Sequence, residues 1–529
     1  MLSSSSVPSI AGILLGLIPP ALAIVTWAWK VMNWVWLKPM KFERLLRQQG
    51  ISGNRYRFLF GDLKVSSLML RNANSRPIGL SDDIAPRLLP FLHQSLGTHG
   101  KNFFMWIGTT PALNIMHPEQ LKDVFLRIDD FQKIRLNPLA KMLTTGLAHY
   151  DGDKWEMHRR IINPAFQLGK LKLMLPAFYS SCNEMVMRWE KLMGAEESCE
   201  LDAWTDIQNL TRQVIAQTAF GSSYEEGKVI FQLQTEQGEL AVKSMHMVYI
   251  PGWRFLPTKM NRRMKSIYEQ VQSLLRTMID KREKAMEAGK AATDDLLGLL
   301  LESNAKEIRE NRRRGDRKVG MSMGDVIEEC KLFYLVGQET TSSLLAWAMV
   351  LLSIHPQWQD CARLEVLQVL GRDRLPSFDE LNHLKIVTMI LYEVLRLYPP
   401  VPLFARDVPN ETKLGELTIP AGVKLLMPAL LIHHDRELWG EDAKEFKPER
   451  FCDGISKATK NQLLYFPFGW GPRICLGQNL SLIEVKIAMA MILQRFSFEL
   501  SPSYAHAPMS AFTLQPQHGV QVILRRSSV

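Results

Sequence analysis

The residues best suited to chemistry surround a single cysteine near the C-terminus. Cys475 lies in Phe468-Gly469-Trp470-Gly471-Pro472-Arg473-Ile474-Cys475-Leu476-Gly477, just before an apolar stretch that predicts a helix over Leu480–Phe496. The unpaired N–H groups and partial positive charge at a helix start favour a thiolate over a thiol. Glycines let the backbone pass close to a flat partner, and Arg473 can neutralise an acidic group on that partner. A thiolate facing a planar dianion suits proximal ligation of haem iron.

A lone cysteine in a glycine-rich loop is most often a structural thiol, so the spacing of its neighbours is decisive. Phe468, Gly471, Arg473, Cys475 and Gly477 reproduce the pattern F-x-x-G-x-R-x-C-x-G. This pattern resembles the signature of the cytochrome P450 family, and the chain is similar to plant-type microsomal members from about residue 40 onward. The resemblance implies a mainly α fold with small β-sheets, a long central helix over the haem, and haem b ligated by Cys475.

A second constellation lies within the longest predicted helix, which begins at Ser322 and ends near Ile354, before a proline. Inside it, Val336-Gly337-Gln338-Glu339-Thr340-Thr341 places an acid beside a hydroxyl. Such a threonine can hydrogen-bond back to the preceding turn and open the helix locally. An isolated Glu-Thr pair is more often a surface acid beside a core residue.

In this context the segment resembles the family's oxygen-activation pattern, [A/G]-G-x-[D/E]-T-[T/S]. The resemblance implies that Thr340 hydrogen-bonds dioxygen and that Glu339 helps to deliver protons. The sequence departs from the pattern at Val336, where the family has a small residue, and this change can narrow the oxygen pocket.

Three charged residues further along resemble the family's E-x-x-R and P-x-R-F arrangement. Glu393 and Arg396 share one face of a predicted helix that ends at Pro399-Pro400. Arg450 follows in Phe446–Phe451. The resemblance implies a buried structural charge network beside the haem.

Further cofactor contacts are implied by the same resemblance. Trp155 and Arg159 match a W-x-x-x-R pattern, and their N–H groups suit a haem propionate. We expect His158 to be a surface residue and His434 to reach the haem edge. The residues expected to bind the cofactor are Cys475, Arg473, Trp155, Arg159, Arg406, Phe468, Gly469 and Gly477.

Four largely apolar segments are expected to form the walls of a substrate pocket: residues 136–147, 333–340, 401–404 and 514–516. The individual residues expected to line it are Phe333, Val336, Gly337, Leu403, Phe404 and Leu514. An apolar wall favours a hydrophobic substrate, such as a terpenoid, fatty acid, hormone or foreign compound.

The N-terminus differs in kind from the rest of the chain. Ile10–Trp29 contains no charged residue, and about 20 apolar residues suffice to cross a bilayer. Basic residues follow this stretch from Lys30 and none precedes it, which places the N-terminus in the lumen. A cleaved signal peptide is the alternative, but it needs a basic start and a shorter apolar run. The expected organisation is a luminal segment over 1–9, a transmembrane signal anchor over 10–29, a basic juxtamembrane segment and hinge over 30–57, and a catalytic domain over 58–529.

The composition limits the classes of protein and partner that are possible. The 529 residues are 46% hydrophobic and 22% charged, which suits a large globular core. The net charge of +10 fits an anionic membrane surface or an acidic partner protein. Nucleic acid is the weakest alternative because zinc-finger, helix-turn-helix and RNA-binding signatures are missing. Six scattered cysteines predict neither a disulfide framework nor a zinc site, and they fit a reducing compartment.

The remaining segments add detail to the predicted fold. The charged run Lys306–Lys318 is expected to be a solvated loop between helices, although a nucleic-acid patch or localisation signal is an alternative. Phe42–Gln49 predicts a short basic amphipathic helix. Strands are predicted near Phe103–Trp106, Leu113–Ile115, Leu417–Thr418, Lys424–Leu426 and Val520–Leu524.

Together these features favour a haem-thiolate monooxygenase that inserts one atom of O2 into a hydrophobic small molecule. The resemblance implies electrons from NADPH through NADPH–cytochrome P450 reductase, and a single-pass location in the endoplasmic reticulum membrane with the catalytic domain in the cytosol. Two alternatives remain: a haem-thiolate isomerase or dehydratase acting on a peroxide, and a non-catalytic haem sensor. The intact Glu339-Thr340 pair argues against both.

Overall fold

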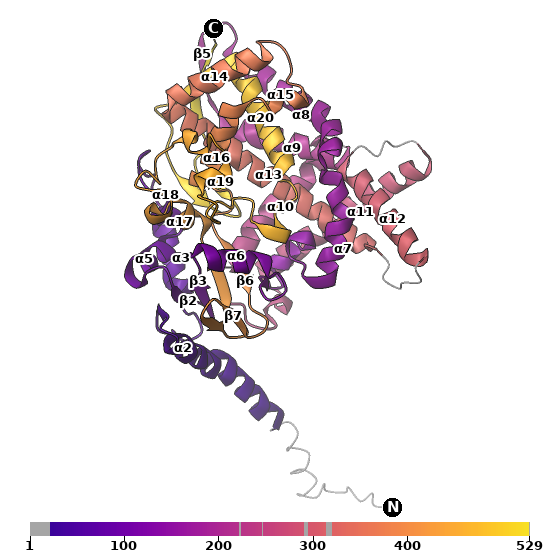
Figure 1. Ribbon diagram of the computed structural model, residues 1–529. Coiled ribbons are helices and arrows are strands. Elements are labelled where there is room, and N and C mark those ends of the chain that lie inside the picture. Colours follow the sequence, from indigo (N-terminus) through magenta and orange to yellow (C-terminus); the bar gives the residue numbers. More distant parts are fainter. Residues whose placement is uncertain (1–21, 222–223, 246, 290–294, 314–319, 528–529) are drawn as a thin grey trace, which may run out of the picture.

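Long helices account for most of the fold in this computed structural model, which describes residues 22–221, 224–245, 247–289, 295–313 and 320–527 (Figure 1). The longer helices are α2 (Lys38–Gln48), α3 (Leu63–Ala73), α5 (Pro90–His99), α6 (Pro118–Leu126), α7 (Gly152–Ile162), α8 (Leu168–Met193), α9 (Ala203–Phe220), α10 (Tyr224–Met245), α11 (Lys259–Glu287), α12 (Leu296–Arg313), α13 (Met323–Ile354), α14 (Pro356–Leu370), α16 (Lys385–Leu397) and α20 (Gln478–Arg495). The short helices are α4 (Ala85–Leu88), α15 (Phe378–Leu381), α17 (Ala429–His433), α18 (Arg436–Trp439) and α19 (Ile455–Ala458).

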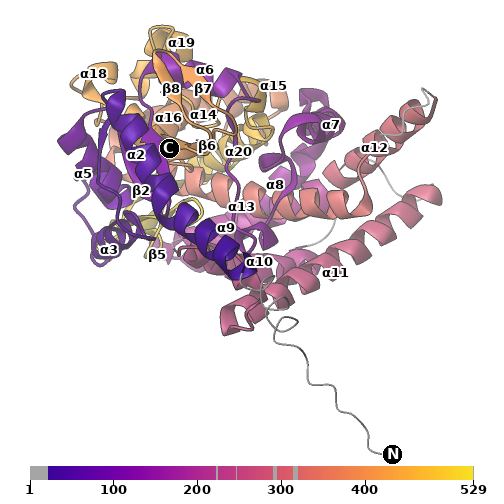
Figure 2. The ribbon, with the colours of Figure 1, turned by 90° about the horizontal axis from the view of Figure 1, so that it is seen from below.

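Helix α13 runs through the middle of the helical body, as the two ribbon views agree (Figures 1 and 2). It begins with a capping box, in which the Ser322 side chain accepts from the Asp325 N–H and the Asp325 carboxylate accepts from the Ser322 N–H. Pro356 starts the next helix. The cap at Ser322 and the end at Ile354 confirm the bounds of the helix predicted from the sequence. Among the described residues α13 is the one helix long and apolar enough to span a bilayer, and it is buried in the core instead.

The β-structure forms small sheets at the edge of the helices. The largest has the order β1-β2-β3-β9-β6-β4 and mixes parallel with antiparallel pairs. Its strands are β1 (Ser52–Gly53), β2 (Phe103–Ile107), β3 (Thr110–Asn114), β9 (Lys424–Met427), β6 (Phe404–Asp407) and β4 (Gln132–Lys133). The other sheets are β10 (Phe496–Leu500), β13 (Gln521–Arg526) and β5 (Ser198–Asp202); β11 (Pro508–Ser510) and β12 (Leu514–Pro516); β7 (Thr412–Leu414) and β8 (Leu417–Ile419). All five predicted strands are present, with ends shifted by a few residues.

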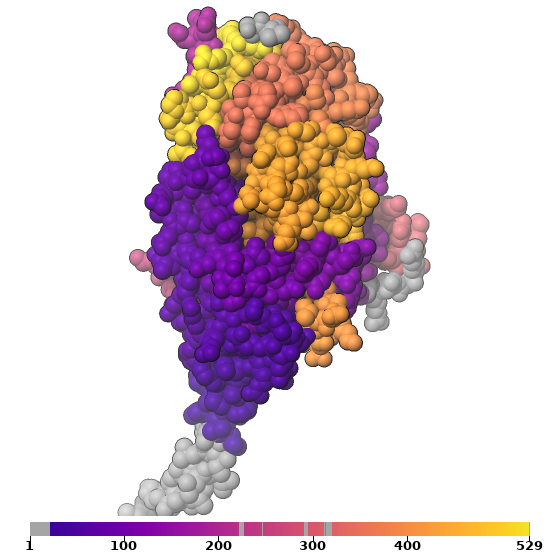
Figure 3. All heavy atoms as spheres, turned by 60° about the vertical axis from the view of Figure 1, so that its left-hand side comes forward, coloured from indigo at the N-terminus to yellow at the C-terminus, as the bar shows by residue number. Residues whose placement is uncertain are grey.

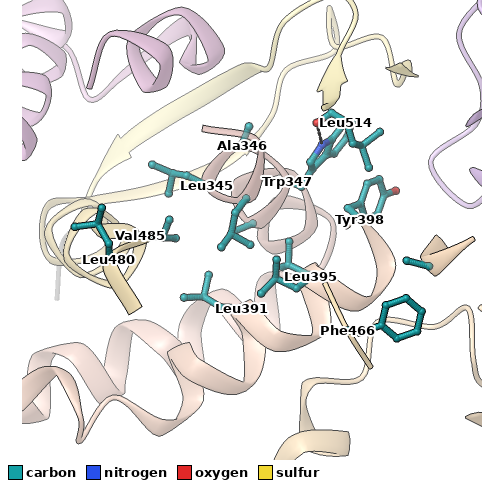
Figure 4. Close-up of a cluster of buried hydrophobic side chains, with 14 of the residues drawn as sticks. Leu345, Ala346, Trp347, Leu391, Leu395, Tyr398, Phe466, Leu480, Val485 and Leu514 are labelled. Atoms are coloured by element: carbon teal, nitrogen blue, oxygen red, sulfur yellow. Dashed lines mark hydrogen bonds between the residues drawn. The ribbon is translucent and has the colours of Figure 1, made fainter. Parts of the chain in front are cut away.

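The centre of the core joins three helices that are distant in the sequence. Leu345 of α13 lies on the side of Val485 of α20, while Leu391 and Leu395 of α16 lie below α13 and Trp347 lies on its other side, toward Leu514 (Figure 4). All six side chains are at most 1% exposed. This packing fixes α20, and therefore the loop that carries Cys475, against the long central helix.

The N-terminal part of the chain extends outward from this body. Residues 22–32 are helical and lead through a π-helical segment, η1 (Asn33–Leu37), into α2 (Figure 1). The apolar side chains of this extension are largely exposed, with Trp27 at 68% and Trp29 at 58%. Phe42 and Leu46 of α2 are buried, which ties the predicted basic helix to the body. Most of the predicted anchor, residues 10–21, lies outside the described residues.

The space-filling view shows how the two ends of the sequence meet. The indigo and purple N-terminal part forms the lower half of this face and packs against the orange and yellow C-terminal part (Figure 3). The parallel pairing of β3 with β9 joins the same two parts, with Leu113 opposite Leu425. The sheet therefore depends on both ends of the sequence.

One predicted loop is instead helical. The charged run from Lys306 continues helix α12 as far as Arg313, and α11 and α12 extend beyond the rest of the body (Figure 2). The apolar residues Leu296, Leu299 and Leu300 bury the start of α12, and its charged residues continue the helix toward solvent. The rest of the run, residues 314–318, lies outside the described residues.

Candidate functional site

The loop around Cys475 has a backbone that its glycines make possible. Gly469 and Gly471 both have positive φ, 71° and 72°. A Cβ atom at Gly471 would lie 3.0 Å from the carbonyl oxygen of Phe125, so a larger residue would push α6 away. The Cys475 N–H donates to the carbonyl of Phe468 over 2.9 Å and closes the loop just before α20 begins at Gln478.

The electrostatics at Cys475 differ from the simple expectation of a thiolate. Desolvation by the surrounding protein atoms raises the pKa of the Cys475 thiol above its ordinary value, while part of the side chain stays exposed. Backbone N–H groups of Gly477 and Gln478 lower the pKa, as do the charges of Arg159 and Lys133, but this desolvation has the larger effect. The N–H groups at the helix start lower the pKa of the thiol, as predicted. The loss of hydration of a thiolate in this setting raises the pKa by more.

Four cationic side chains surround this loop. Arg159 Nη1 donates to the carbonyl of Ile474, the residue before Cys475, over 2.9 Å. Burial and the neighbouring charge of Arg473 lower the pKa of Arg406 to about 10. Burial, Arg406 and Arg473 together lower the pKa of Lys133 well below its ordinary value. Lys133 belongs to β4 and was not predicted as a site residue.

Arg473 joins this group to Trp155. Its guanidinium lies 4.4 Å from the centre of the Trp155 ring, donates to Asp151 Oδ1 over 2.6 Å and donates to the carbonyl of Tyr150 over 2.8 Å. Within the described part of the chain, Nε of Arg406 and Nε of Arg473 are buried without a hydrogen-bond partner. Crowded cations with free donors fit an anionic ligand.

These residues fit haem. A cysteine sulfur is a suitable iron ligand, and the glycine loop lets a flat molecule approach it. The cations of Arg159, Arg406, Arg473 and Lys133 match the two acidic groups of protoporphyrin. Phe468 and Phe404 are half-buried beside the loop, and a Cβ at Gly469 would lie 3.8 Å from the Phe404 ring.

The acid and the alcohol in α13 have different partners. Thr340 Oγ1 donates to the carbonyl of Val336 over 2.9 Å, which is the predicted bond to the preceding turn. Helix α13 is nevertheless continuous through this point, so the structure does not contain the expected local opening. Glu339 is buried, and its carboxylate accepts from Thr513 Oγ1 at 3.2 Å and from the Gln515 amide.

Two residues predicted to line the substrate pocket lie elsewhere. A Cβ at Gly337 would be 2.4 Å from Cδ1 of Ile215, so this glycine faces α9 and permits close packing of two helices. Leu514 is 0% exposed and packs in the core shown in Figure 4. Of the other predicted wall residues, Phe333, Val336 and Leu403 are half-buried, and Phe333 lies against Phe166 with the ring centres 6.0 Å apart.

The predicted charge network comes together in the structure. Arg396 Nε and Nη2 donate to the two oxygens of Glu393, both over 2.7 Å, and neither side chain is exposed. Arg396 Nη1 also donates to the carbonyls of His433 and Ala443. Arg450 Nε lies 3.6 Å from the Glu393 carboxylate, although its hydrogen bonds go to the 439–442 segment. This network connects α16 to the segment that precedes the cysteine loop.

The expectation for His158 requires correction, while the reach of His434 to the haem edge stays a prediction. His158 is fully buried, and its Nδ1 lies 2.6 Å from Glu329 Oε1 on α13, because helix α7 turns this side chain inward. The other carboxylate oxygen of Glu329 accepts from the Leu147 N–H over 3.1 Å. His434 is buried: its Nε2 lies 2.9 Å from the carbonyl of Leu397, and its Nδ1 lies 3.6 Å from Asp83.

Comparison with known proteins agrees with this arrangement. The sequence model described as "Cytochrome P450" matches residues 87–524. Cytochrome P450 72A397 of Kalopanax septemlobus is 58% identical over 94% of this chain and 95% of its own. Cytochrome P450 72A15 of Arabidopsis thaliana is 53% identical over 96% of this chain and 97% of its own. A solved structure, retinoic acid bound cyanobacterial CYP120A1, has a TM-score of 0.73 and 21% identity, and covers 90% of this chain and 99% of that one.

Proposed function

Because the chain belongs to the cytochrome P450 family, and its near relatives are plant proteins of the 72A group, we propose that it is a haem-thiolate monooxygenase for a hydrophobic small molecule. The observation that carries the proposal is the group of cations around the Cys475 loop, joined through the core to an acid–alcohol pair in α13. Haem, when bound, supplies the chemistry that splits O2 and inserts one oxygen atom into the substrate.

The chain's own residues bind and orient the cofactor. Cys475 provides the sulfur ligand from a loop that the Phe468 carbonyl and the glycines hold in place. Arg159, Arg406 and Arg473 provide positive charge for two propionates, and the basic side chain of Lys133 lies beside them. Burial of these cations strengthens their interaction with an anion, because less water competes for it.

Proton delivery is assigned to α13. Thr340 carries a hydroxyl that can both donate and accept a hydrogen bond. Burial raises the pKa of Glu339, which keeps a larger share of this acid protonated near neutral pH. A buried acid with a raised pKa next to a hydroxyl residue suits the transfer of protons.

The electron supply and location follow from the same proposal. NADPH is proposed to donate electrons through a membrane-bound NADPH–cytochrome P450 reductase, whose acidic surface would suit a chain of net charge +10. The exposed apolar helix over residues 22–32 supports anchoring in the endoplasmic reticulum membrane, with the body of the protein in the cytosol.

The test is oxygen-dependent turnover of the haem-loaded protein with its reductase. A panel of terpenoids, fatty acids and other apolar compounds is first screened for shifts of the Soret band. Compounds that bind should then give an oxygenated product with consumption of NADPH and O2. Thr340→Ala should keep haem and substrate binding but lower the ratio of product to NADPH, and an unchanged ratio would favour rearrangement of a peroxide instead.

A further inference from the structure

The hairpin of β11 and β12 is attached to one face of α13. Glu339, Ser343 and Trp347 follow one another at intervals of four residues and therefore lie along the same side of the helix. Ser343 Oγ and Trp347 Nε1 both donate to the carbonyl of Leu514, the tryptophan over 3.1 Å (Figure 4). These two bonds hold the backbone of the hairpin at a fixed position along the helix.

The side chains on either side of Leu514 hold the acid instead. Thr513 Oγ1 donates to Glu339 Oε2 over 3.2 Å, and the Gln515 amide donates to the same oxygen. Gln515 Nε2 also lies 3.3 Å from Thr513 Oγ1, so the two donors support each other. Thr513 is 1% exposed and Glu339 is 8% exposed. The hairpin therefore binds α13 in two separable ways, through its backbone and through the Glu339 carboxylate.

A charged residue on a neighbouring helix also acts on the acid. Arg212 on α9 acts on Glu339 electrostatically and lowers its pKa. In the amide orientation that satisfies both groups, the Gln338 oxygen accepts from Arg212 Nε and Nη2, each at 3.1 Å. Glu339 is therefore held by two neutral donors on the hairpin and also feels the charge of a guanidinium on α9.

Thr340, by contrast, points to another side of the helix. Consecutive residues on a helix do not face each other, and the Thr340 hydroxyl donates to Val336 within α13. The orientation of the Glu339 carboxyl relative to Thr340 is thus determined by groups outside α13.

We propose that Thr513 and Gln515 are positioning residues for Glu339, so that the C-terminal hairpin fixes the orientation of the carboxyl group that delivers protons. This inference rests on the proposed function, since it requires Glu339 to take part in oxygen activation. Neither hairpin residue touches the reacting atoms. Their effect passes through the carboxylate that they hold.

The experiment compares matched variants of the haem-loaded, full-length protein. Thr513→Val and Gln515→Leu each remove one donor, Thr513→Ser restores the hydroxyl, and Ser343→Ala removes a backbone attachment of the hairpin without touching Glu339. We expect the ratio of product to NADPH to fall about 3- to 10-fold in Thr513→Val and Gln515→Leu, part of the roughly 10²- to 10⁴-fold effect of general acid catalysis. Thr513→Ser should match wild type, and so should Ser343→Ala, because Trp347 Nε1 still holds the Leu514 carbonyl in that variant.

A spectroscopic readout separates positioning from a structural role. Both hairpin donors lower the pKa of Glu339, so their loss should raise it and shift the pH dependence of the ratio upward. The infrared band of the protonated Glu339 carboxyl is identified by its loss in Glu339→Gln. At the same pH this band should be stronger in Thr513→Val and Gln515→Leu than in wild type, because a larger fraction of the acid is protonated. An unchanged band and ratio in both variants would overturn the proposal.

Two reference variants distinguish this failure from failure of the proposed function. If Glu339→Gln and Thr340→Ala lower the ratio while the two hairpin variants match wild type, the positioning role alone is wrong. If neither reference variant lowers the ratio, proton delivery by this pair is wrong, and the positioning role fails with it.

Discussion

Replacing Glu393 by glutamine removes one charge from an ion pair that is closed to solvent. The Glu393 carboxylate accepts two hydrogen bonds of 2.7 Å from Arg396 and one of 3.0 Å from the Lys447 N–H. A neutral amide has one oxygen to accept with, so the Arg396 guanidinium keeps its charge without a buried counterion. Removing one member of such a pair costs about 3–5 kcal/mol, and we expect Glu393→Gln to lower the free energy of unfolding by that amount.

A matched control exists in the same network. Asp442 pairs with Arg450 at 3.1 Å and with Lys447 at 2.8 Å, but its side chain is 31% exposed. Exposed pairs contribute about 0–1 kcal/mol, so Asp442→Asn should have a small effect. The double variant Glu393→Leu/Arg396→Met removes both buried charges and should lose less stability than the two single variants together.

The assay is urea unfolding of the haem-loaded proteins, followed by far-ultraviolet circular dichroism and by Soret absorbance, with free energies taken from midpoints and slopes. The reasoning would be refuted if Glu393→Gln and Asp442→Asn lowered the free energy of unfolding by amounts within about 1 kcal/mol of each other. Breaking the buried pair would then cost no more than breaking an exposed one.

Three further predictions test other parts of the account. Deletion of Met1–Trp29 should weaken membrane association on fractionation while haem content stays unchanged, and loss of haem would contradict a separate anchor. Gly337→Ala should lower the thermal midpoint by the equivalent of about 1–3 kcal/mol, because the new Cβ would overlap Ile215. Adding Ile215→Ala to this variant should restore part of the loss, and a Gly337→Ala protein as stable as wild type would refute the contact between these two positions. Burial lowers the pKa of His506 from 6.5 to about 4, so the folded state favours the neutral ring, and stability should be lost as pH falls from 6.5 toward 4. His506→Gln should show a smaller loss over this range in unfolding curves, and an identical pH dependence would contradict the shift.

Elements with local signals at their ends could be predicted from the sequence. Helix α13 has a capping box at Ser322 and a proline two residues after its end, at Pro356, and both are short-range features. The cysteine loop is likewise defined within ten residues. The strand at Phe103–Ile107 follows from a run of aromatic and apolar residues.

Features that depend on distant partners could not be predicted. The burial of His158 requires Glu329, which is 171 residues away in the sequence. Lys133 lies on the two-residue strand β4 without a local pattern, and β6 brings it to the site by pairing Lys133 with Arg406.

The direction of a side chain also depends on distant partners. Leu514 and Gln515 are consecutive in β12, so they point to opposite faces. The pairing of β12 with β11 and the contact of β12 with α13 determine which of the two side chains is buried in the core. In this structure the buried side chain is Leu514. The sequence neighbours of Gly337 predict a pocket wall, whereas Ile215 of α9 lies against this glycine.

The identity of the iron ligand is the central claim, and the spectrum of the reduced, CO-bound protein tests it most directly. The wild type should show the strongly red-shifted Soret band of a thiolate-ligated haem. Cys475→Ala should lose that band, whereas Cys452→Ala, at another exposed cysteine, should keep it. Persistence of the red-shifted band in Cys475→Ala would show that another residue ligates the iron and would contradict the account.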